Sequence, residues 1–286
     1  MWLYESKLGP GQSSVLNEAA SRRLPQTHIT LLGPDSVVRL PGDALSLVLV
    51  LAGTGIIAGS ESELTVAARH FMVCERGTAV LARLQAHGLL LILSFSEAAL
   101  RRLLPDAGRE PLPGDGVLDR ATLQRICSVL RAADATTTQF WRREPAVRAL
   151  LRRITALQAD LFARMSACPG KSYSRKLQVM TRMQRARIYL EAHSDRNVRI
   201  AELAELTSYS HCYFTKTFHR VYGMSPKTCA TQYRLQRACR MLRDRTHSVG
   251  EVAVACGFDN QSAFARAFRQ HFGVSATLAR NEAVRA

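Results

Sequence analysis

The C-terminal third of the chain contains the same helical pattern twice. The first copy runs from Ile200 to Ser225 and the second from Val249 to Ser275. Equivalent residues are 49 positions apart up to Tyr209 and 50 positions apart after it, so the second copy has one extra residue near its middle. The shared aromatic and glycine positions are Tyr209, Phe214, Phe218, Tyr222 and Gly223, matched by Phe258, Phe264, Phe268, Phe272 and Gly273. A repeat of this length indicates a duplicated supersecondary unit.

Each copy has the pattern of two short helices joined by a tight turn. Ser248 followed by Glu251 is typical of a capping box at a helix start. Gly257 then ends that helix, because glycine tolerates the left-handed conformation of a C-cap. Asn260 is the expected N-cap of the next helix, and Ser210 is the corresponding cap in the first copy. This is the pattern of a helix-turn-helix unit, whose second helix presents its N-terminal residues to the major groove of DNA.

The distribution of charge agrees with a nucleic-acid partner. The whole chain carries a formal net charge of +16. From residue 171 to the end there are 20 Lys and Arg against 8 Asp and Glu, whereas residues 1–170 hold 19 against 15. A basic domain of small helices is suited to neutralising phosphates, although a solvated surface that maintains solubility is the alternative reading.

Several spaced motifs match a known family. In order, they are Gly223-Met-Ser-Pro226, the segment Tyr233–Leu242, the run Val252–Phe258 and the Phe264–Arg269 stretch. Residues 185–279 resemble the DNA-binding domain of the AraC/XylS family of transcription regulators, in which a long helix joins two helix-turn-helix units. One departure is Ala276, where the family usually repeats the proline seen at Pro226. We expect this substitution to loosen a loop without changing the fold.

The resemblance also implies which residues contact DNA. A linking helix from Thr228 to about Arg245 would span about 27 Å, compared with about 34 Å between successive major-groove faces. One chain would therefore read two adjacent groove segments. The side chains expected to contact DNA are His211, Cys212, Thr215, Lys216, Gln261, Ser262, Arg266 and Arg269. For several of them, Lys216 and Arg269 above all, contact with phosphate alone is the alternative.

The N-terminal part has a different pattern. Apolar runs at 45–51 and 89–95, bounded by turn signals that include Gly53-Thr-Gly55 and His87-Gly88, are typical of β-strands. Residues 71–74 indicate another strand. These features resemble, more weakly, the cupin-like barrel of many regulators of this family, which can enclose a ligand. The predicted fold class is α+β: a mainly β, cupin-like sensing domain at 1–110, a helical segment and linker at 111–170, and an all-α DNA-binding domain at 171–286.

The helical segment between the two domains has an apolar face. Its members are Val147, Leu150, Leu151, Ile154, Leu157 and Leu161. Their heptad-like spacing favours a dimerisation helix, which would bring two DNA-binding domains to adjacent sites. Packing of this helix on the chain's own barrel is the equally weighted alternative.

Composition excludes several other classes. No segment approaches the roughly 18 consecutive apolar residues of a membrane helix. Seven cysteines without Cys-x-x-Cys spacing indicate reduced thiols and a cytoplasmic protein. His28, His70 and His87 are isolated, and no catalytic or phosphate-binding motif is present, so we predict no metal, no cofactor and no enzymatic activity.

The sequence therefore predicts a sequence-specific transcriptional regulator of a bacterial kind, and activation is the commoner behaviour in the family. Its expected partners are double-stranded DNA, RNA polymerase, a second copy of the chain and a small-molecule effector. Control by a regulatory protein instead of a small molecule is one alternative. A nonspecific architectural DNA-binding protein is the other.

Overall fold

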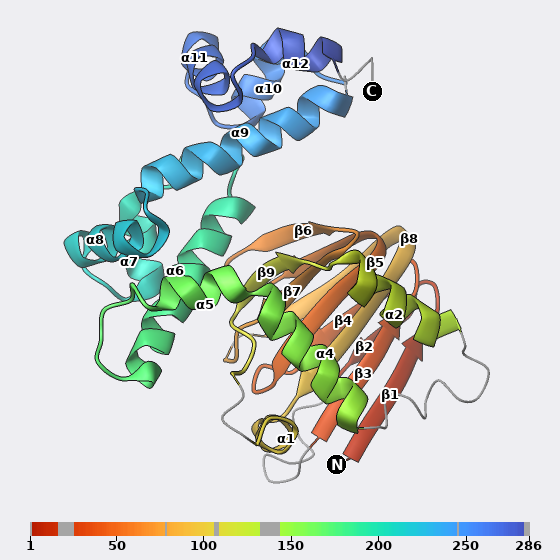
Figure 1. Ribbon diagram of the computed structural model, residues 1–286. Helices are drawn as coiled ribbons and strands as arrows, with labels where there is room; N and C mark the ends of the chain where they lie inside the picture. The colour runs from red at the N-terminus through yellow and green to blue at the C-terminus, as the bar shows by residue number, and fades with distance from the viewer. Residues whose placement is uncertain are drawn as a thin grey trace. The chain divides into compact units, whose positions relative to one another are not determined.

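The computed structural model describes residues 2–16, 26–77, 79–105, 109–131, 144–244 and 246–282 (Figure 1). The chain divides into two compact units, residues 1–166 and 167–286. Each unit is described below by itself.

The first unit is built on one sheet. Its described strands are β1 (Trp2–Leu8), β2 (Ser13–Val15), β3 (Gln26–Leu32), β4 (Val37–Leu40), β5 (Leu45–Ala58), β6 (Glu63–Ala67), β7 (His70–Cys74), β8 (Val80–Phe95) and β9 (Gly114–Val117). The main path runs β1-β3-β8-β5-β7-β9, while β4 joins β2 to β8 and β6 pairs with β5. Only the β1–β3 and β2–β4 pairs are parallel among these strands. The predicted β domain is thus confirmed as a sheet that approaches a barrel.

Strands β5 and β8 run through the glycines that the sequence suggested were turns. This part of the prediction was wrong, because Gly53 and Gly88 lie opposite each other inside the β5–β8 ladder, next to two register shifts. A Cβ atom on Gly53 would lie 1.9 Å from the carbonyl oxygen of His87, so only glycine allows the two backbones to approach this closely. The irregularities bend both strands, and each strand can then pair with different neighbours along its two halves.

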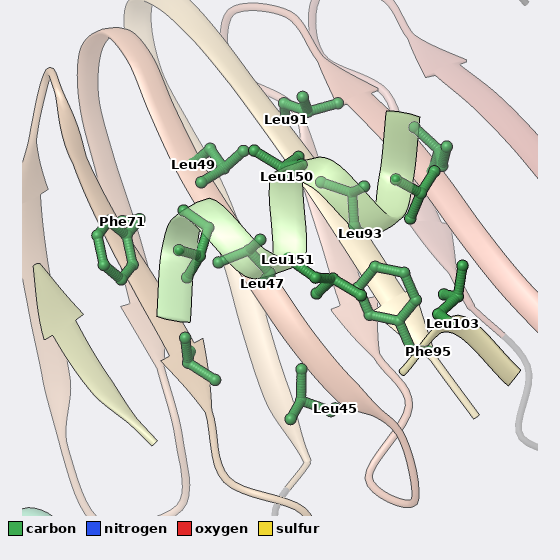
Figure 2. Packing of buried hydrophobic residues seen from close by; sticks show 14 of the residues in the cluster. Leu45, Leu47, Leu49, Phe71, Leu91, Leu93, Phe95, Leu103, Leu150 and Leu151 are labelled. Atoms are coloured by element: carbon green, nitrogen blue, oxygen red, sulfur yellow. The ribbon is translucent and has the colours of Figure 1, made fainter. Parts of the chain in front are cut away.

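Helices cover one face of the sheet. They are α1 (Glu97–Leu103), α2 (Arg120–Arg131) and α4 (Glu144–Leu157), and the short helix α5 (Ala159–Met165) follows α4. Figure 2 shows Leu150 and Leu151 of α4 packed among Leu47, Leu93 and Phe95 of the sheet. These five side chains belong to one buried cluster that also includes residues of α1 and α2.

The burial of α4 decides between the two readings of the apolar helix. Val147, Leu151 and Ile154 are completely buried, and Leu150 is 8% exposed, all in the core of their own unit. Leu157 is half-buried against the same cluster, and Leu161, also half-buried, lies on α5. The structure therefore shows the alternative of a helix that packs on its own sheet. The expected dimerisation face is therefore corrected for Val147, Leu150, Leu151 and Ile154, because they pack against their own sheet. A role of Leu161 in dimerisation stays a prediction.

The predicted continuous helix also breaks between Leu157 and Leu161. Gln158 lies between α4 and α5, and its side chain is buried. Its amide accepts a hydrogen bond from the backbone N–H of Leu112 at 2.9 Å and donates one to the carbonyl of the same residue at 2.7 Å. These two bonds to a segment distant in sequence favour a break in the helix at Gln158. Heptad spacing of apolar residues cannot predict such a break.

The second unit is all-helical in its described residues. Its helices are α6 (Tyr173–Ala192), α7 (Ile200–Thr207), α8 (His211–Tyr222), α9 (Pro226–Asp244), α10 (Val249–Ala255), α11 (Gln261–Phe272) and α12 (Ala276–Glu282). The predicted linking helix corresponds to α9, and Arg245 lies outside the described residues. A β unit followed by an all-helical unit confirms the predicted α+β class.

Candidate DNA-binding surface

Two helix-turn-helix units, α7–α8 and α10–α11, share the same turn geometry. In the first turn the Tyr209 N–H donates to the Ala204 carbonyl at 2.9 Å, and in the second the Phe258 N–H donates to the Ala253 carbonyl at 3.0 Å. The residue before each aromatic is left-handed, with φ of 53° at Ser208 and 68° at Gly257. The turns are therefore equivalent at an offset of 49. The extra residue of the second copy follows Phe258, outside this shared turn.

Side-chain caps fix the start of each recognition helix, meaning α8 and α11. Ser210 accepts from the backbone N–H of Tyr213 at 3.3 Å, and Asn260 accepts from that of Ala263 at 2.7 Å. At the start of α10, Ser248 accepts from Glu251 N–H at 3.2 Å while the Glu251 carboxylate accepts from Ser248 N–H at 2.6 Å. These are the three caps named from the sequence, and each satisfies a backbone donor that the helix itself leaves open.

The inner faces of the recognition helices are aromatic. Phe214 and Phe218 of α8 are completely buried, as are Phe264 and Phe268 of α11. Ring centroids within each pair are 5.6 Å and 5.5 Å apart. Since residues three or four positions apart share a helix face, these pairs determine which face of each helix remains outside.

The outer faces carry the side chains expected to contact DNA. His211, Cys212, Thr215 and Lys216 lie on α8, and Gln261, Ser262, Arg266 and Arg269 lie on α11. All are exposed except Thr215, which is half-buried. Within the described part of the chain, none of the eight side chains forms a hydrogen bond or an ion pair. The fold thus groups them in two sets of four, one on each recognition helix.

Two arginines bond to the backbone carbonyls of the two turns and lie over their aromatic rings. Neither of them was identified from the sequence. Arg182 of α6 donates to the Thr207 carbonyl at 3.2 Å, and its guanidinium lies 5.0 Å from the Tyr209 ring centroid. Arg234 of α9 donates through Nε to the Cys256 carbonyl at 2.7 Å and through Nη2 to the Gly257 carbonyl. Its guanidinium lies 4.0 Å from the Phe258 ring centroid.

Arg234 is only 8% exposed, and burial lowers its pKa, opposed by the nearby charge of Asp259. One sequence signal could have identified it. An arginine occupies the apolar stripe of α9 that includes Ala230, Leu235 and Ala238. A charged residue at such a position is buried only when it is paired.

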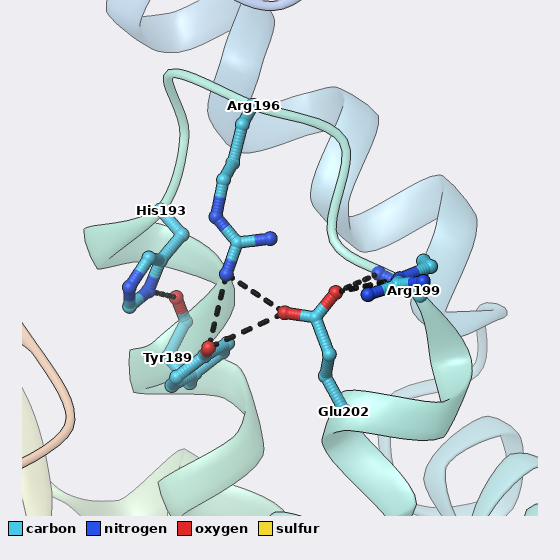
Figure 3. A network of polar contacts seen from close by, with 5 residues as sticks. All are labelled: Tyr189, His193, Arg196, Arg199 and Glu202. Atoms are coloured by element: carbon cyan, nitrogen blue, oxygen red, sulfur yellow. Dashed lines mark hydrogen bonds and ion pairs between the residues drawn. The ribbon is translucent and has the colours of Figure 1, made fainter.

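A polar network orders the loop between α6 and α7 (Figure 3). The Arg196 guanidinium donates to the Glu202 carboxylate at 2.7 Å and to the Tyr189 hydroxyl at 3.0 Å. The backbone N–H of Arg199 donates to the other carboxylate oxygen of Glu202 at 3.1 Å. These bonds, that of Arg196 first, lower the pKa of Glu202 to about 2, and the carboxylate is therefore ionised at neutral pH.

Other kinds of site find less support in the described residues. No helix there has both the length and the apolar character needed to cross a membrane. No three potential metal ligands among His, Cys, Asp and Glu gather in that part of the chain. The arrangement that stands out is the pair of outward-facing recognition helices.

Comparisons with known proteins identify this second unit. A family model described as a helix-turn-helix domain matches residues 203–282. The uncharacterised transcriptional regulator YobQ of Bacillus subtilis is 34% identical over 93 residues, which are 32% of this chain and 39% of YobQ. The virulence regulon transcriptional activator VirF of Yersinia enterocolitica is 24% identical over 161 residues, 56% of this chain and 55% of VirF. The chain thus spans less than two thirds of either relative's length.

A solved structure of a probable AraC family transcriptional regulator from Rhodopseudomonas palustris is 34% identical, covering 36% of this chain and 96% of that one at a TM-score of 0.34. Residues 203–282 therefore match a helix-turn-helix domain, and the two relatives above are named as transcriptional regulators. The family model and the matching regulators agree with the resemblance that the motifs of this domain indicated.

Proposed function

We propose that the protein is a sequence-specific transcriptional regulator that reads two adjacent segments of the DNA major groove with α8 and α11. The observation that carries this proposal is the repeated geometry of the two units. Each presents four outward-facing polar side chains on a helix that is capped at its start and anchored by buried aromatic rings. A net charge of +12 over residues 171–286 supplies the attraction to phosphate.

The linking helix supports readout of two segments by one chain. At 1.5 Å per residue, α9 from Pro226 to Asp244 spans about 28 Å. Successive major-groove faces on one side of DNA lie about 34 Å apart. A modest bend of the DNA covers the difference at a cost of a few kcal/mol.

Individual roles follow from side-chain chemistry. Gln261 is suited to bidentate bonding with adenine and Arg266 with guanine, each discriminating bases by about 1–3 kcal/mol. Lys216 and Arg269 contribute mainly through phosphate, because a charged group near the backbone gains affinity without reading sequence. Cys212 packs against a thymine methyl group.

The remaining roles concern the whole protein. We propose that the β unit receives a signal, a small molecule or a regulatory protein, that changes DNA binding by the second unit. We further propose that the protein acts in the cytoplasm as an activator that contacts RNA polymerase, which the match to the activator VirF supports. Two copies would bind adjacent sites, although not through the buried face of α4. Light scattering would give the oligomeric state, and native mass spectrometry of the purified protein would reveal a retained small molecule or partner.

The direct test is selection of the full chain against random duplex DNA at moderate salt. We expect enrichment of two short blocks about one helical turn apart. Similar affinity for all sequences would support the architectural alternative instead and refute sequence-specific readout.

A matched pair of variants sharpens the test. Arg266→Ala should relax the preference at one base pair and weaken the best site by roughly 10-fold or more. Arg243→Ala removes the same charge from an exposed position of α9 and should weaken all sequences alike. Equal loss of specificity in both variants would contradict base readout by α11.

A further inference from the structure

The turn of the second helix-turn-helix unit is enclosed on two sides. On one side, Arg234 of α9 binds its carbonyls and stacks on Phe258. On the other side, Gly257 lies against the loop between α6 and α7. A Cβ atom added to Gly257 would lie 2.7 Å from Cα of Arg196 and 2.8 Å from the carbonyl oxygen of Asp195. The two backbones are therefore in contact with no side chain between them.

The loop that makes this contact is longer than its repeat equivalent. Residues 193–199 join α6 to α7, while only residues 245–248 join α9 to α10. The connection before the first helix-turn-helix unit thus has three additional residues. The loop that contains them reaches the turn of the second helix-turn-helix unit. The contact with Gly257 is made by this longer loop and not by its shorter counterpart, so the duplication alone does not explain it.

Side-chain bonds hold this loop in place against α6 and α7. Arg196 is bonded to Glu202 of α7 and to Tyr189 of α6, as Figure 3 shows. Its backbone therefore presents a fixed surface to Gly257. A loop without such bonds would yield to a neighbouring turn at little cost.

The N-terminal half of α9 is also fixed to the first helix-turn-helix unit and to α6, which precedes it. Cys229 and Ala230 are buried, and α9 packs against α6. The Arg187 guanidinium of α6 donates to the Tyr233 hydroxyl of α9 at 2.6 Å. Arg234 follows Tyr233 directly. It therefore projects from a part of α9 whose position is determined by packing against α6.

We propose that Arg234 is a positioning residue that, by pressing the turn at Gly257 between α9 and the loop 193–199, fixes the spacing of the two DNA blocks that α8 and α11 read. Rotation of the second helix-turn-helix unit about α9 would have to break the Arg234 bonds on one side or push Gly257 into Arg196 on the other. This inference rests on the proposed DNA readout and deepens it, since it assigns the spacing between blocks to residues that touch no base.

The test is a spacer selection on the full chain. Duplexes carry the two blocks selected by the wild-type protein, separated by spacers that differ by single base pairs. One base pair displaces the second block by about 3.4 Å and rotates it by about 35°, so the wild type should prefer one spacer by about 10-fold or more over its neighbours. Arg234→Met should reduce this preference to about threefold or less while the base preferences within each block persist.

The control is Arg240→Met, which removes the same charge from an exposed position of the same helix. It should lower affinity for all spacers alike and retain the wild-type preference. An Arg234→Met protein that keeps the wild-type spacing preference would overturn the inference. Absence of any two-block motif in the wild type would overturn the proposed function instead, so the two failures are distinguishable.

A second pair of variants applies if circular dichroism shows that Arg234→Met does not fold. Gly257→Ala displaces the turn from the opposite side, and Gly273→Ala introduces the same backbone strain where the Cβ atom meets nothing within 4 Å. Only Gly257→Ala should shift or broaden the preferred spacer. The same spacing profile in both glycine variants would overturn the inference.

Discussion

Replacement of Gly257 by alanine should destabilise the second unit more than the same replacement at Gly273. Both glycines are left-handed, with φ of 68° and 76°, so both substitutions impose the same kind of backbone strain. An L-residue in this conformation costs about 1–2 kcal/mol. The lower flexibility of the unfolded chain offsets about 0.4–1 kcal/mol of that cost. We therefore expect Gly273→Ala to lower the free energy of unfolding by about 1 kcal/mol.

The surroundings of Gly257 add a second cost. The alanine Cβ would lie 2.7 Å from Cα of Arg196 and 2.8 Å from the Asp195 carbonyl oxygen. Carbon atoms in contact are normally about 3.5–4.0 Å apart, so the turn and the loop must separate by about 1 Å. Both neighbours are backbone atoms, which no side-chain rotation can move aside. Overpacking of this kind adds about 1–3 kcal/mol, for a total of about 2–4 kcal/mol.

Two measurements on the full chain check this difference. In calorimetry, the transition of the second unit should occur about 4–10 °C lower in Gly257→Ala than in Gly273→Ala. Hydrogen exchange followed by mass spectrometry should accelerate in peptides that cover residues 193–199 only for Gly257→Ala. Equal melting temperatures and unchanged exchange in that loop would refute the contact and, with it, the reasoning about the enclosed turn.

Two further predictions concern single polar side chains. Because the pKa of Glu202 is lowered to about 2 from 4.5, chiefly by Arg196, its contribution to stability is complete above pH 4.5 and is lost as the pH falls towards 2. Urea unfolding of Glu202→Gln should show a weaker dependence on pH in that window, and identical pH profiles would contradict the network. Gln158→Ala should cost about 2–3 kcal/mol, since it leaves both backbone groups of Leu112 unpaired in the core. Gln236→Ala, an exposed control on α9, should stay within about 0.5 kcal/mol in the same denaturant titration, and a similar cost for both would contradict the burial argument.

Local patterns predicted the elements of the second unit because its signals are local. Caps such as Ser210 and Asn260 bond to residues three positions away, and the aromatic stripe of each recognition helix repeats within one turn. The outward direction of the eight side chains expected to contact DNA follows from that stripe. Their contacts with bases stay a prediction.

The first unit was less predictable because its decisive contacts are distant in sequence. Gly53 has the local signature of a turn, and only its partner Gly88 on the neighbouring strand makes it part of a ladder. The apolar face of α4 is equally suited to a second chain or to the chain's own sheet. Burial of Leu151 against the strands settles that question, and no periodicity in the helix contains this information.

The arginines behind the two turns show that the repeat is larger than the sequence motifs indicated. Arg182 and Arg234 are 52 positions apart, and each bonds to the end of the helix before its turn and lies over the aromatic that follows. At the same offset, the buried Ala186 and Leu190 of α6 correspond to the buried Ala238 and Leu242 of α9.

The repeated unit is therefore three helices, with α6 and α9 as equivalent first members. Helix α9 has two functions in this arrangement. It packs on the first three-helix repeat and is also the first helix of the second repeat. The proposal that Arg234 couples the two helix-turn-helix units rests on this double role. The offset falls from 52 at the first helices to 49 at the turns because the loop 193–199 is three residues longer than its counterpart. Those three residues belong to the loop that contacts the turn at Gly257, so the departure from symmetry lies at the contact to which we assign the fixed spacing of the two helix-turn-helix units.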